Sequence, residues 1–203
     1  GEWWIQDYSS QIPVSLLKIK SNDDVLDLCA APGGKTAQLI SLGARVTSID
    51  NNRKRLFKLE QNLKRLNYQT IIENKDIRNF SSQKTWPKII LDAPCSSTGT
   101  LRKNPEIMYQ KKESDIISLS KLQSELLDAA WDLLQEGGTL LYCTCSLEKE
   151  EGEHQIENFI KRKKNSLLDK INTNEIDKKL KTSNKDKWLR IFPNSLDYEG
   201  GNY

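Results

Sequence analysis

Short apolar segments alternate with amphipathic segments along most of the chain. The apolar segments are nearly continuous in Val, Ile and Leu, as expected for strands that are covered on both faces of a sheet. They occupy residues 24–30, 45–50, 70–76, 88–94 and 139–145. The amphipathic segments predict helices that begin near Lys35, Arg53, Ser118 and Glu150. Strands that alternate with helices are typical of βαβ units, so we expect an α/β fold with a mostly parallel sheet and helices on both faces.

The segment from Asn165 to Lys187 differs in composition from the rest of the chain. It is rich in Asn, Lys, Asp and Thr, which predicts a loop or a weakly ordered excursion. The motif WLRIFP at 188–193 predicts a late strand, and the chain stops at EGGNY without a further element. With 203 residues, 36% of them hydrophobic, the chain is long enough for one sizeable core, so we expect a single domain over residues 1–203.

Charge and hydropathy narrow the class of protein. The chain has 31 Lys and Arg against 28 Asp and Glu, and a net charge of +3 is compatible with a nucleic-acid partner without requiring one. Basic clusters at 51–67 and 161–164 are equally well explained as solvated helix faces. No apolar segment approaches the roughly 20 residues that a membrane span needs, and no signal peptide is recognisable. We therefore expect a cytoplasmic protein that does not contact a membrane.

The four cysteines all lie where apolar segments end. They are Cys29, Cys95, Cys143 and Cys145. Four cysteines in a chain of this length do not make a disulfide framework, and Cys-x-Cys is not a usual zinc spacing. The one histidine, His154, lies on a polar segment, which speaks against a metal site and against most histidine-activated nucleophiles. We expect Cys143, one step deeper than Cys145 on the same strand face, to be a small buried residue.

The motif DLCAAPGGKT places two glycines between the first strand and the first helix. It matches neither a P-loop nor G-x-G-x-x-G, so it predicts a nucleoside-like site without a phosphate cradle. Asp50 ends the second strand, where a carboxylate can accept both hydroxyls of a ribose. S-adenosylmethionine fits this pattern, with its carboxylate at the loop amides and Asp76, at the end of the third strand, facing the adenine. The alternative is that Asp50 and Asp76 only cap helices or form turns.

Four motifs together resemble the RNA 5-methylcytosine methyltransferases, and within that family the bacterial small-subunit ribosomal RNA enzymes of the Sun (RsmB) type. The motifs are IQDYSSQ at 5–11, DLCAAPGGKT at 27–36, LDAPCSSTG at 91–99 and YCTCS at 142–146. The resemblance covers roughly residues 1–160. It implies a Rossmann-like S-adenosylmethionine-dependent methyltransferase fold and a cytosine in RNA, with ribosomal RNA as the expected partner. We expect a monomer without a metal.

The resemblance also assigns roles to individual residues. In the family, the cysteine of the T-C-S motif is the nucleophile and that of the P-C-S motif assists product release, which gives these roles to Cys145 and Cys95. The cofactor contacts implied in the same way are Cys29, Ala30, Ala31, Pro32, Gly33, Gly34, Lys35, Asp50, Asp76 and Asp92. Family members usually carry an N-terminal RNA-binding domain and a final DGFF-like strand, and neither is found in this sequence. We therefore expect a catalytic-domain fragment that is truncated at the C-terminal strand.

The chemistry of this reaction accounts for two thiols. Carbon 5 of cytosine becomes nucleophilic only after a group adds to carbon 6, and a thiolate is well suited to that addition. A free cysteine has a pKa of about 8.5, so a nearby cation, with Lys35 as the candidate, is expected to favour the thiolate. The carbon 5 proton and the thiol must then leave, which requires a second group such as Cys95. Asp92 is the candidate to hydrogen-bond the cytosine edge.

Two other functions are open at this level. A DNA cytosine-5 methyltransferase would use the Pro-Cys thiol, Cys95, as nucleophile and would leave Cys145 without a role. A non-catalytic cofactor-binding protein that assists ribosome assembly would not need the full set of titratable groups. Methyl incorporation from labelled cofactor into ribosomal RNA, compared with DNA, distinguishes the three.

Overall fold

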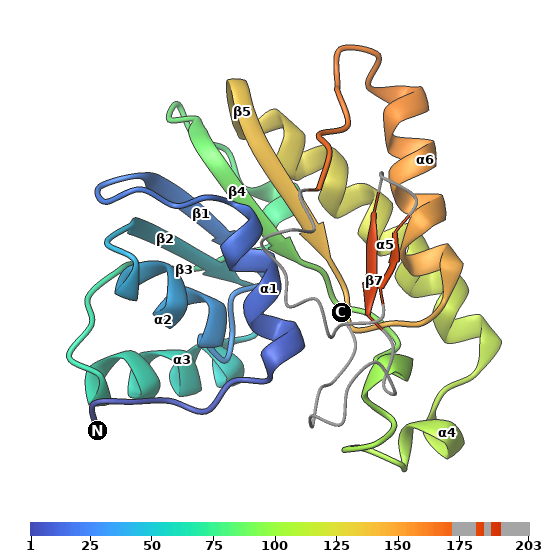
Figure 1. Cartoon of the computed structure of the whole chain (residues 1–203), viewed down its shortest axis with the longest axis horizontal. Coiled ribbons are helices and arrows are strands. Elements are labelled where there is room, and N and C mark those ends of the chain that lie inside the picture. The colour runs from blue at the N-terminus through green and yellow to red at the C-terminus, as the bar shows by residue number, and fades with distance from the viewer. Residues whose placement is uncertain (172–181, 185–187, 192–203) are drawn as a thin grey trace. The chain divides into compact units, whose positions relative to one another are not determined.

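The computed structural model describes residues 1–171, 182–184 and 188–191 (Figure 1). A five-stranded sheet has the strand order β3-β2-β1-β4-β5. The strands are β1 (Asp24–Leu28), β2 (Arg45–Asp50), β3 (Ile71–Asn74), β4 (Trp86–Asp92) and β5 (Leu134–Cys143). The pairings of β1 with β2, of β1 with β4 and of β2 with β3 are parallel, and they confirm the predicted α/β fold.

Helices follow the strands as the hydrophobic pattern predicts. They are α2 (Gly34–Ser41), α3 (Arg53–Arg65), α5 (Glu113–Asp132) and α6 (Glu153–Arg162). Helix α5 begins at Glu113 rather than near Ser118 because its first turn is acidic and polar, so the apolar pattern that marks the helix appears only later. Helices α1 (Tyr8–Leu16) and α4 (Ile107–Gln110) were not predicted, since α1 contains Pro13 and α4 is a single turn. The 3-10 helices are η1 (Ile77–Asn79), η2 (Thr98–Thr100) and η3 (Lys149–Glu151).

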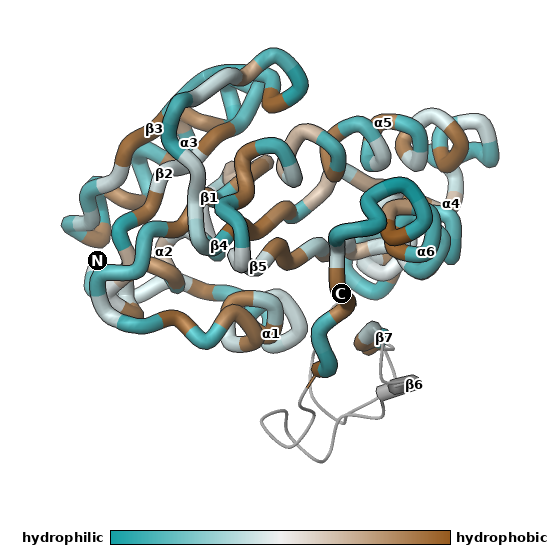
Figure 2. The backbone as a smooth tube through the Cα atoms, turned by 90° about the horizontal axis from the view of Figure 1, so that it is seen from above, coloured by the Kyte–Doolittle hydropathy of each residue, from teal (hydrophilic) through white to brown (hydrophobic). Residues whose placement is uncertain are grey.

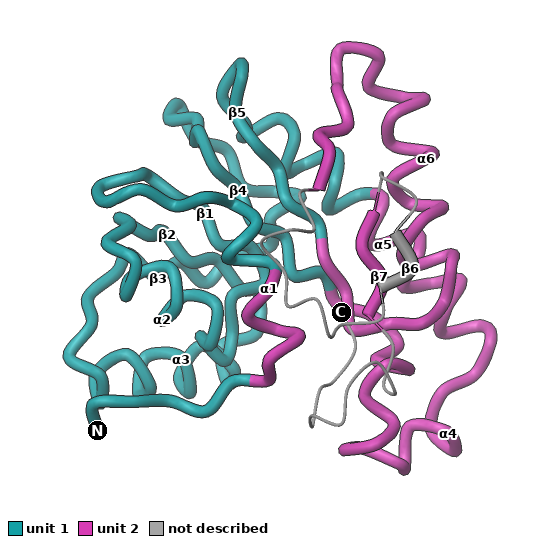
Figure 3. Tube along the Cα trace, viewed as in Figure 1, with its two compact units in different colours: residues 1–6, 13–93, 125–142 teal, residues 7–12, 94–124, 143–203 magenta. Residues whose placement is uncertain are grey.

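Contacts between residues divide the chain into two compact units (Figure 3). Unit 1 comprises Gly1–Gln6, Pro13–Ala93 and Glu125–Tyr142. Unit 2 comprises Asp7–Ile12, Pro94–Ser124 and Cys143–Tyr203. Unit 1 therefore holds almost the whole sheet and the glycine loop, whereas unit 2 holds the segments that follow β4 and β5 along the chain.

The core of unit 1 explains why these segments are strands and helices. Strand β1 is buried from Val25 to Leu28, and β4 is buried from Ile89 to Leu91, as expected for strands that are covered on both faces. Figure 2 shows hydrophobic residues gathered in these central strands and hydrophilic residues along helices such as α6. Helices α2 and α3 pack together through one apolar cluster, which includes Ala37, Leu56, Leu59 and Leu63.

The strand order also determines which face of the sheet each connection covers. Connections between parallel strands are right-handed, and the chain moves outward in one direction from β1 to β3 but in the other direction from β4 to β5. Helices α2 and α3 therefore cover one face, and the part of α5 in unit 1 covers the other. The predicted arrangement with helices on both faces follows from this reversal.

The C-terminal part of the chain differs from the prediction at one place. Thr182–Asn184 form β6, which pairs antiparallel with β7 (Leu189–Ile191), although they lie in the segment predicted to be a loop. Short polar residues carry no hydrophobic alternation, so only the backbone pairing with β7 reveals this strand. Residues 165–171 form neither helix nor strand, and β7 confirms the late strand. The remainder of the predicted loop and the EGGNY terminus lie outside the described residues.

The turn from β1 into α2 depends on Gly33, which precedes the helix with a φ of 100°. A Cβ on Gly33 would lie 3.0 Å from Cγ of Leu59 on α3, whereas a Cβ on Gly34 would come no closer than 3.9 Å to another residue. Left-handed backbone and close packing therefore both require glycine at position 33 but not at position 34.

We predict that Gly33→Ala lowers the free energy of unfolding by about 1–2 kcal/mol because a Cβ is strained in the left-handed region. Gly34→Ala should be neutral or slightly stabilising, since Ala is favoured over Gly inside a helix. Urea unfolding of the wild type and both variants, without ligand, measures the difference. Equal stability of the two variants would contradict the requirement for glycine at position 33.

Candidate active site

The glycine loop leaves β1 through a tight turn in unit 1. Cys29 has a positive φ of 59°, and the next amide, that of Ala30, donates to the carbonyl of Ile49 at 3.1 Å. The amide of Gly33 donates to the carbonyl of Ala30 at 2.9 Å, which closes the turn before α2. Burial raises the pKa of the Cys29 thiol, and the charge of Asp50 adds to this effect. Cys29 therefore stays a neutral thiol, in agreement with a part played by its backbone.

Asp50 lies at the end of β2 and connects this strand to the glycine loop. Its carboxylate is only 2% exposed and accepts two backbone amides, those of Ala31 at 3.2 Å and Asn52 at 2.9 Å. Arg55 lies 3.8 Å away. A carboxylate has about four acceptor positions, so these two bonds leave capacity for hydroxyl donors. Asp50 thus holds the loop, and its predicted contact with a ribose stays a prediction.

Lys35 and Asp92 form an ion pair in unit 1. Nζ of Lys35 lies 2.7 Å from Oδ2 of Asp92, and the Lys35 side chain is 7% exposed against 30% for Asp92. The sequence predicted Lys35 as a cation beside a thiol and Asp92 as a partner for cytosine. In the structure these two residues pair with each other. The charge of Asp92 therefore weakens the electrostatic effect of Lys35 on a neighbouring group.

Asp76 lies two residues beyond the end of β3 rather than on the strand. Its carboxylate accepts the backbone amide of Arg78 at 3.0 Å and caps η1. The Arg78 guanidinium also pairs with it, at 2.6 Å from Nη2, and lowers the pKa of Asp76. The alternative reading of Asp76 as a cap is therefore realised in the structure, and a contact with adenine remains a prediction for the same carboxylate.

Asp27 is a buried carboxyl that the sequence did not single out. It is 0% exposed in β1, where Oδ2 accepts the hydroxyl of Thr36 at 2.6 Å. Oδ1 has no hydrogen-bond partner within the described part of the chain. Burial raises the pKa of Asp27 to about 7, against the Thr36 hydrogen bond and the Lys35 charge, while Asp92 and Asp50 raise it further. Its position in an apolar strand pattern hid it, because strand periodicity does not reveal a buried carboxyl.

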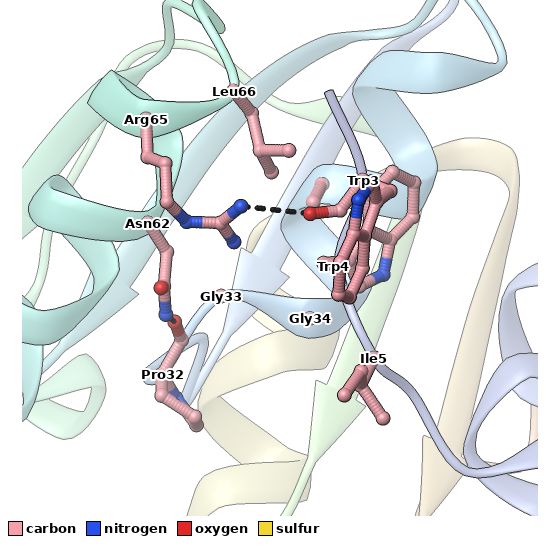
Figure 4. A pocket seen from close by; sticks show the side chains of 10 residues that line it. Trp3, Trp4, Ile5, Pro32, Gly33, Gly34, Asn62, Arg65 and Leu66 are labelled. Carbon is pink, nitrogen blue, oxygen red and sulfur yellow. Dashed lines mark hydrogen bonds between the residues drawn. The ribbon is translucent and has the colours of Figure 1, made fainter. Parts of the chain in front are cut away.

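A pocket of about 340 Å³ lies beside the glycine loop in unit 1 (Figure 4). Its lining includes Trp3, Trp4, Asn62 and Arg65 as well as Pro32, Gly33 and Gly34 of the loop. Figure 4 shows Arg65 directed at the backbone of Trp3, whose carbonyl accepts a hydrogen bond from it at 2.7 Å. Asp50, Asp76 and Asp92 do not line this pocket, so it is separate from the predicted acidic contacts with the cofactor.

The two predicted catalytic thiols lie side by side in unit 2. Sγ of Cys95 is 3.3 Å from Sγ of Cys145, and both residues are partly exposed. Sγ of Cys145 lies 3.4 Å from Oγ of Ser97, and the carbonyl of Cys145 accepts the amide of Gly99 at 2.9 Å. All four cysteines are thiols rather than disulfides, and Cys143 is buried as predicted. The structure therefore brings together the pair that the sequence singled out.

The protonation of Cys95 is set by its neighbours. The hydrogen bond with Cys145 and burial raise the pKa of the Cys95 thiol well above its ordinary value, and the charge of Glu151 contributes in the same direction. The Cys95 thiol is therefore protonated at neutral pH and shares a hydrogen bond with Sγ of Cys145. A thiol that stays protonated is suited to giving up a proton rather than to nucleophilic attack.

Glu151 was not predicted as a site residue, since it lies in the acidic segment 148–153 that resembles a solvated face. It is 0% exposed and accepts hydrogen bonds from Ser96 and Ser146, the residues that follow the two cysteines predicted to be catalytic. Only its neighbours in space distinguish it from Glu150, which is exposed.

Two kinds of site are not found in the described ranges 1–171, 182–184 and 188–191. None of their helices is long and apolar enough to cross a membrane. No group of three or more His, Cys, Asp or Glu side chains there has an arrangement that could hold a metal ion.

The strand order, the glycine loop and an acidic residue at the end of β2 define a Rossmann-like S-adenosylmethionine-dependent methyltransferase fold. A model of the 16S rRNA methyltransferase RsmB/F family matches residues 14–202, and the chain belongs to this family. It is similar to ribosomal RNA small subunit methyltransferase B of Photorhabdus laumondii, with 40% identity over 176 residues, and to that of Citrobacter koseri, with 41% over 174 residues.

These alignments cover 84% and 82% of this chain but only 41% of each relative, so the chain spans about two fifths of their length. Among solved structures, the chain is similar to PH0851, with 32% identity and a TM-score of 0.86 over 94% of this chain and 43% of the other. It is also similar to NSun6 from Pyrococcus horikoshii with SFG, with 29% identity and a TM-score of 0.82 over 94% of this chain and 49% of the other.

Asp27 should make the stability depend on pH. Its carboxyl has a pKa of about 7 when folded and 3.8 ordinarily, so the native state loses stability as pH rises from about 4 to 7. We predict that Asp27→Asn removes this loss. The stability of the variant relative to the wild type should rise by up to about 1.4 kcal/mol per pH unit in this window and then level off.

Asp24→Asn is the matched control for urea unfolding between pH 5 and 8. The hydrogen bond from Arg45 lowers the pKa of Asp24, so its stabilising contribution is lost only as pH falls below about 4. The difference between this variant and the wild type should stay constant above pH 5. A constant difference for Asp27→Asn as well would mean that Asp27 is ionised in the native state throughout.

Proposed function

We propose that this protein transfers a methyl group from S-adenosylmethionine to carbon 5 of a cytosine in RNA, with small-subunit ribosomal RNA as the substrate and Cys145 as the covalent nucleophile. The observation that carries the proposal is the approach of the Cys95 and Cys145 sulfurs to 3.3 Å. Membership of the RsmB/F family supports the ribosomal RNA substrate. This reaction uses two adjacent thiols, whereas core packing gives no reason for two thiols to lie together.

The residues of unit 1 fit S-adenosylmethionine, which supplies an electrophilic methyl group when bound. Asp50 offers a carboxylate with unused acceptor capacity at the end of β2. Within Cys29 to Lys35, the amides of Ala30, Ala31 and Gly33 bind groups of the protein and Pro32 has none, so we assign the contact with the cofactor carboxylate to the start of α2, where the helix dipole favours an anion. Asp76, two residues beyond β3, and Asp92, at the end of β4, complete the proposed contacts.

The thiols divide the reaction between them. The Cys145 thiolate adds to carbon 6 of cytosine, and the ring then carries enough electron density at carbon 5 to accept the methyl group. The adduct is resolved when the carbon 5 proton leaves and the Cys145 sulfur is eliminated. Cys95, which is held protonated, gives its proton to the departing Cys145 sulfur and then, as a thiolate, takes the carbon 5 proton, so that both cysteines end as thiols.

Lys35 and Asp92 are the proposed polar partners of the base. Asp92 is 30% exposed and is fixed by Lys35, and its carboxylate is the proposed acceptor for a hydrogen bond from a cytosine amino group. Lys35 balances the charge of this carboxylate.

We also propose that the protein acts as a cytoplasmic monomer, and sedimentation of the purified chain measures its oligomeric state.

We predict that Cys145→Ala and Cys95→Ala differ in kind. Cys145→Ala should abolish both methylation and the covalent link, because the ring is never activated. Cys95→Ala should permit attack and methyl transfer but slow elimination, so a protein–RNA adduct should accumulate and survive denaturing electrophoresis. The measurement combines that gel with methyl incorporation from labelled cofactor into ribosomal RNA and into DNA.

Cys143→Ala is the matched control, because Cys143 is a buried thiol at the end of β5, two residues before Cys145. It should retain methylation and form no persistent adduct. An adduct seen only for Cys145→Ala would reverse the roles of the two thiols and favour chemistry of the DNA methyltransferase type. Methylation that is unchanged in both site variants would exclude the covalent mechanism.

We further predict that Asp50→Asn weakens cofactor binding by about 1.5–3 kcal/mol, the contribution of hydrogen bonds to a charged group. The amide keeps the shape of the side chain but removes its charge. Titration calorimetry on the wild type and the variant measures the loss, with Asp24→Asn as a control on another paired carboxylate of unit 1. Unchanged affinity would remove Asp50 from the cofactor site.

A further inference from the structure

Glu151 is the most deeply buried acidic group among the described residues of unit 2. It is the last residue of η3, six residues after Cys145 along the chain, and it is 0% exposed. Its neighbour Glu150 carries the same side chain and is exposed. A buried carboxylate is costly unless hydrogen bonds replace its hydration, so the contacts of Glu151 show what its position achieves.

The contacts of Glu151 converge on the two residues that follow the catalytic cysteines. The amide of Ser96 donates to its two carboxylate oxygens at 2.9 and 3.2 Å, and the hydroxyl of Ser96 donates to Oε2. The hydroxyl of Ser146 donates to the same oxygen at 2.5 Å, and the two serine oxygens lie 3.1 Å apart. One carboxylate therefore joins the segment that carries Cys95 to the segment that carries Cys145.

The other contacts of this cluster hold the same two segments. Nε2 of Gln123 donates to Oε1 of Glu151 and to the carbonyl of Pro94, each at 2.9 Å. The hydroxyl oxygen of Thr98 accepts the amide of Leu147 at 2.9 Å. The donors named here to Glu151 are neutral amides and hydroxyls, which leave the carboxylate its negative charge.

We propose that Glu151 is a positioning residue that sets the separation and orientation of the Cys95 and Cys145 thiols by holding Ser96 and Ser146. This role rests on the proposed function of the two thiols. Because each serine is bonded to its cysteine through one peptide group, a shift of either serine moves the neighbouring sulfur. A misplacement of about 1 Å in a reacting group can cost about 100-fold in rate.

The negative charge of Glu151 adds an electrostatic effect to this geometric one. It raises the pKa of the Cys95 thiol and so helps to keep that thiol protonated. Removal of the charge should lower the pKa of Cys95 and make its alkylation faster at a given alkaline pH. Loss of a single hydrogen bond from Ser146 leaves the charge in place and should not have this electrostatic effect.

The test compares Glu151→Gln, Ser146→Ala and the matched control Glu150→Gln in the full chain. Glutamine is nearly isosteric, but its amide nitrogen presents donors toward groups that are themselves donors. The first measurement is the rate of alkylation by iodoacetamide at each cysteine against pH, without RNA or cofactor, read by peptide mass spectrometry. The second is methyl transfer to ribosomal RNA together with adduct formation.

Glu151→Gln should shift the alkylation profile of Cys95 to lower pH and reduce methyl transfer by about 100-fold. Ser146→Ala should reduce methyl transfer less and leave the Cys95 profile in place, and Glu150→Gln should match the wild type in both. Cys143, which is buried, reports on general loosening of the fold, and its alkylation should not change in any variant.

Two results would overturn the proposal. One is a wild-type Cys95 profile and wild-type methyl transfer in Glu151→Gln. The other is faster alkylation of Cys143 together with Cys95 in that variant while Ser146→Ala behaves as the wild type, which would mean that Glu151 only stabilises the fold. The alkylation profiles decide on Glu151 even if the wild-type chain methylates no RNA, an outcome that would contradict the proposed function alone.

Discussion

Burying a carboxylate costs several kcal/mol unless hydrogen bonds replace its water, and the loops that follow the strands of this protein are organised around three such groups. Asp27 and Glu151 are 0% exposed and Asp50 is 2% exposed. Asp50 holds the glycine loop through the amide of Ala31, and Asp27 holds the start of α2 through Thr36. Glu151 holds the residues after both thiols. Each carboxylate thus fixes the segment that it contacts by hydrogen bonds from a buried position.

The three carboxylates are satisfied in different ways, and the difference has chemical consequences. Asp50 and Glu151 accept several amide and hydroxyl donors, which stabilise a charge in a buried place. Asp27 has one hydroxyl partner and an oxygen without a partner in the described residues, so burial raises its pKa to about 7. A carboxyl of this kind makes the framework under the glycine loop responsive to pH near neutrality.

Much of the fold followed from the hydrophobic pattern, and the reasons for the exceptions are local. Runs such as RVTSID and KIILD are apolar enough to mark buried parallel strands, and α3 has a clear amphipathic period, so all were predicted close to their observed bounds. Helix α4 and strand β6 are too short to show a period. The start of α5 is polar, and β3 ends before Asp76, because backbone pairing rather than composition determines where a strand stops.

The candidate site was predictable to the extent that its residues carry unusual chemistry at a strand end. Cys95 and Cys145 met that condition, and the structure places their sulfurs in contact. Asp27, Ser96 and Glu151 did not, because a carboxyl inside an apolar run, a serine in a turn and one glutamate among several have no distinctive pattern. Their parts depend on which atoms meet in space, as Asp27 meets Thr36 within unit 1 and as Ser96 meets Ser146 and Glu151 across 50 or more residues.

In the proposed reaction both sulfurs must reach the same cytosine, so the distance between them matters. Carbon 5 and carbon 6 of cytosine are bonded neighbours, so a nucleophile at one and a proton-handling group at the other must themselves lie within a few ångströms. Sulfurs 3.3 Å apart satisfy this condition before any substrate binds, and preorganisation of this kind avoids a cost during the reaction. Two thiolates at that distance would repel each other, so the pair favours one thiolate and one thiol. The hydrogen bond with Cys145 and burial raise the pKa of the Cys95 thiol, which supports the proposed role of Cys145 as the nucleophile.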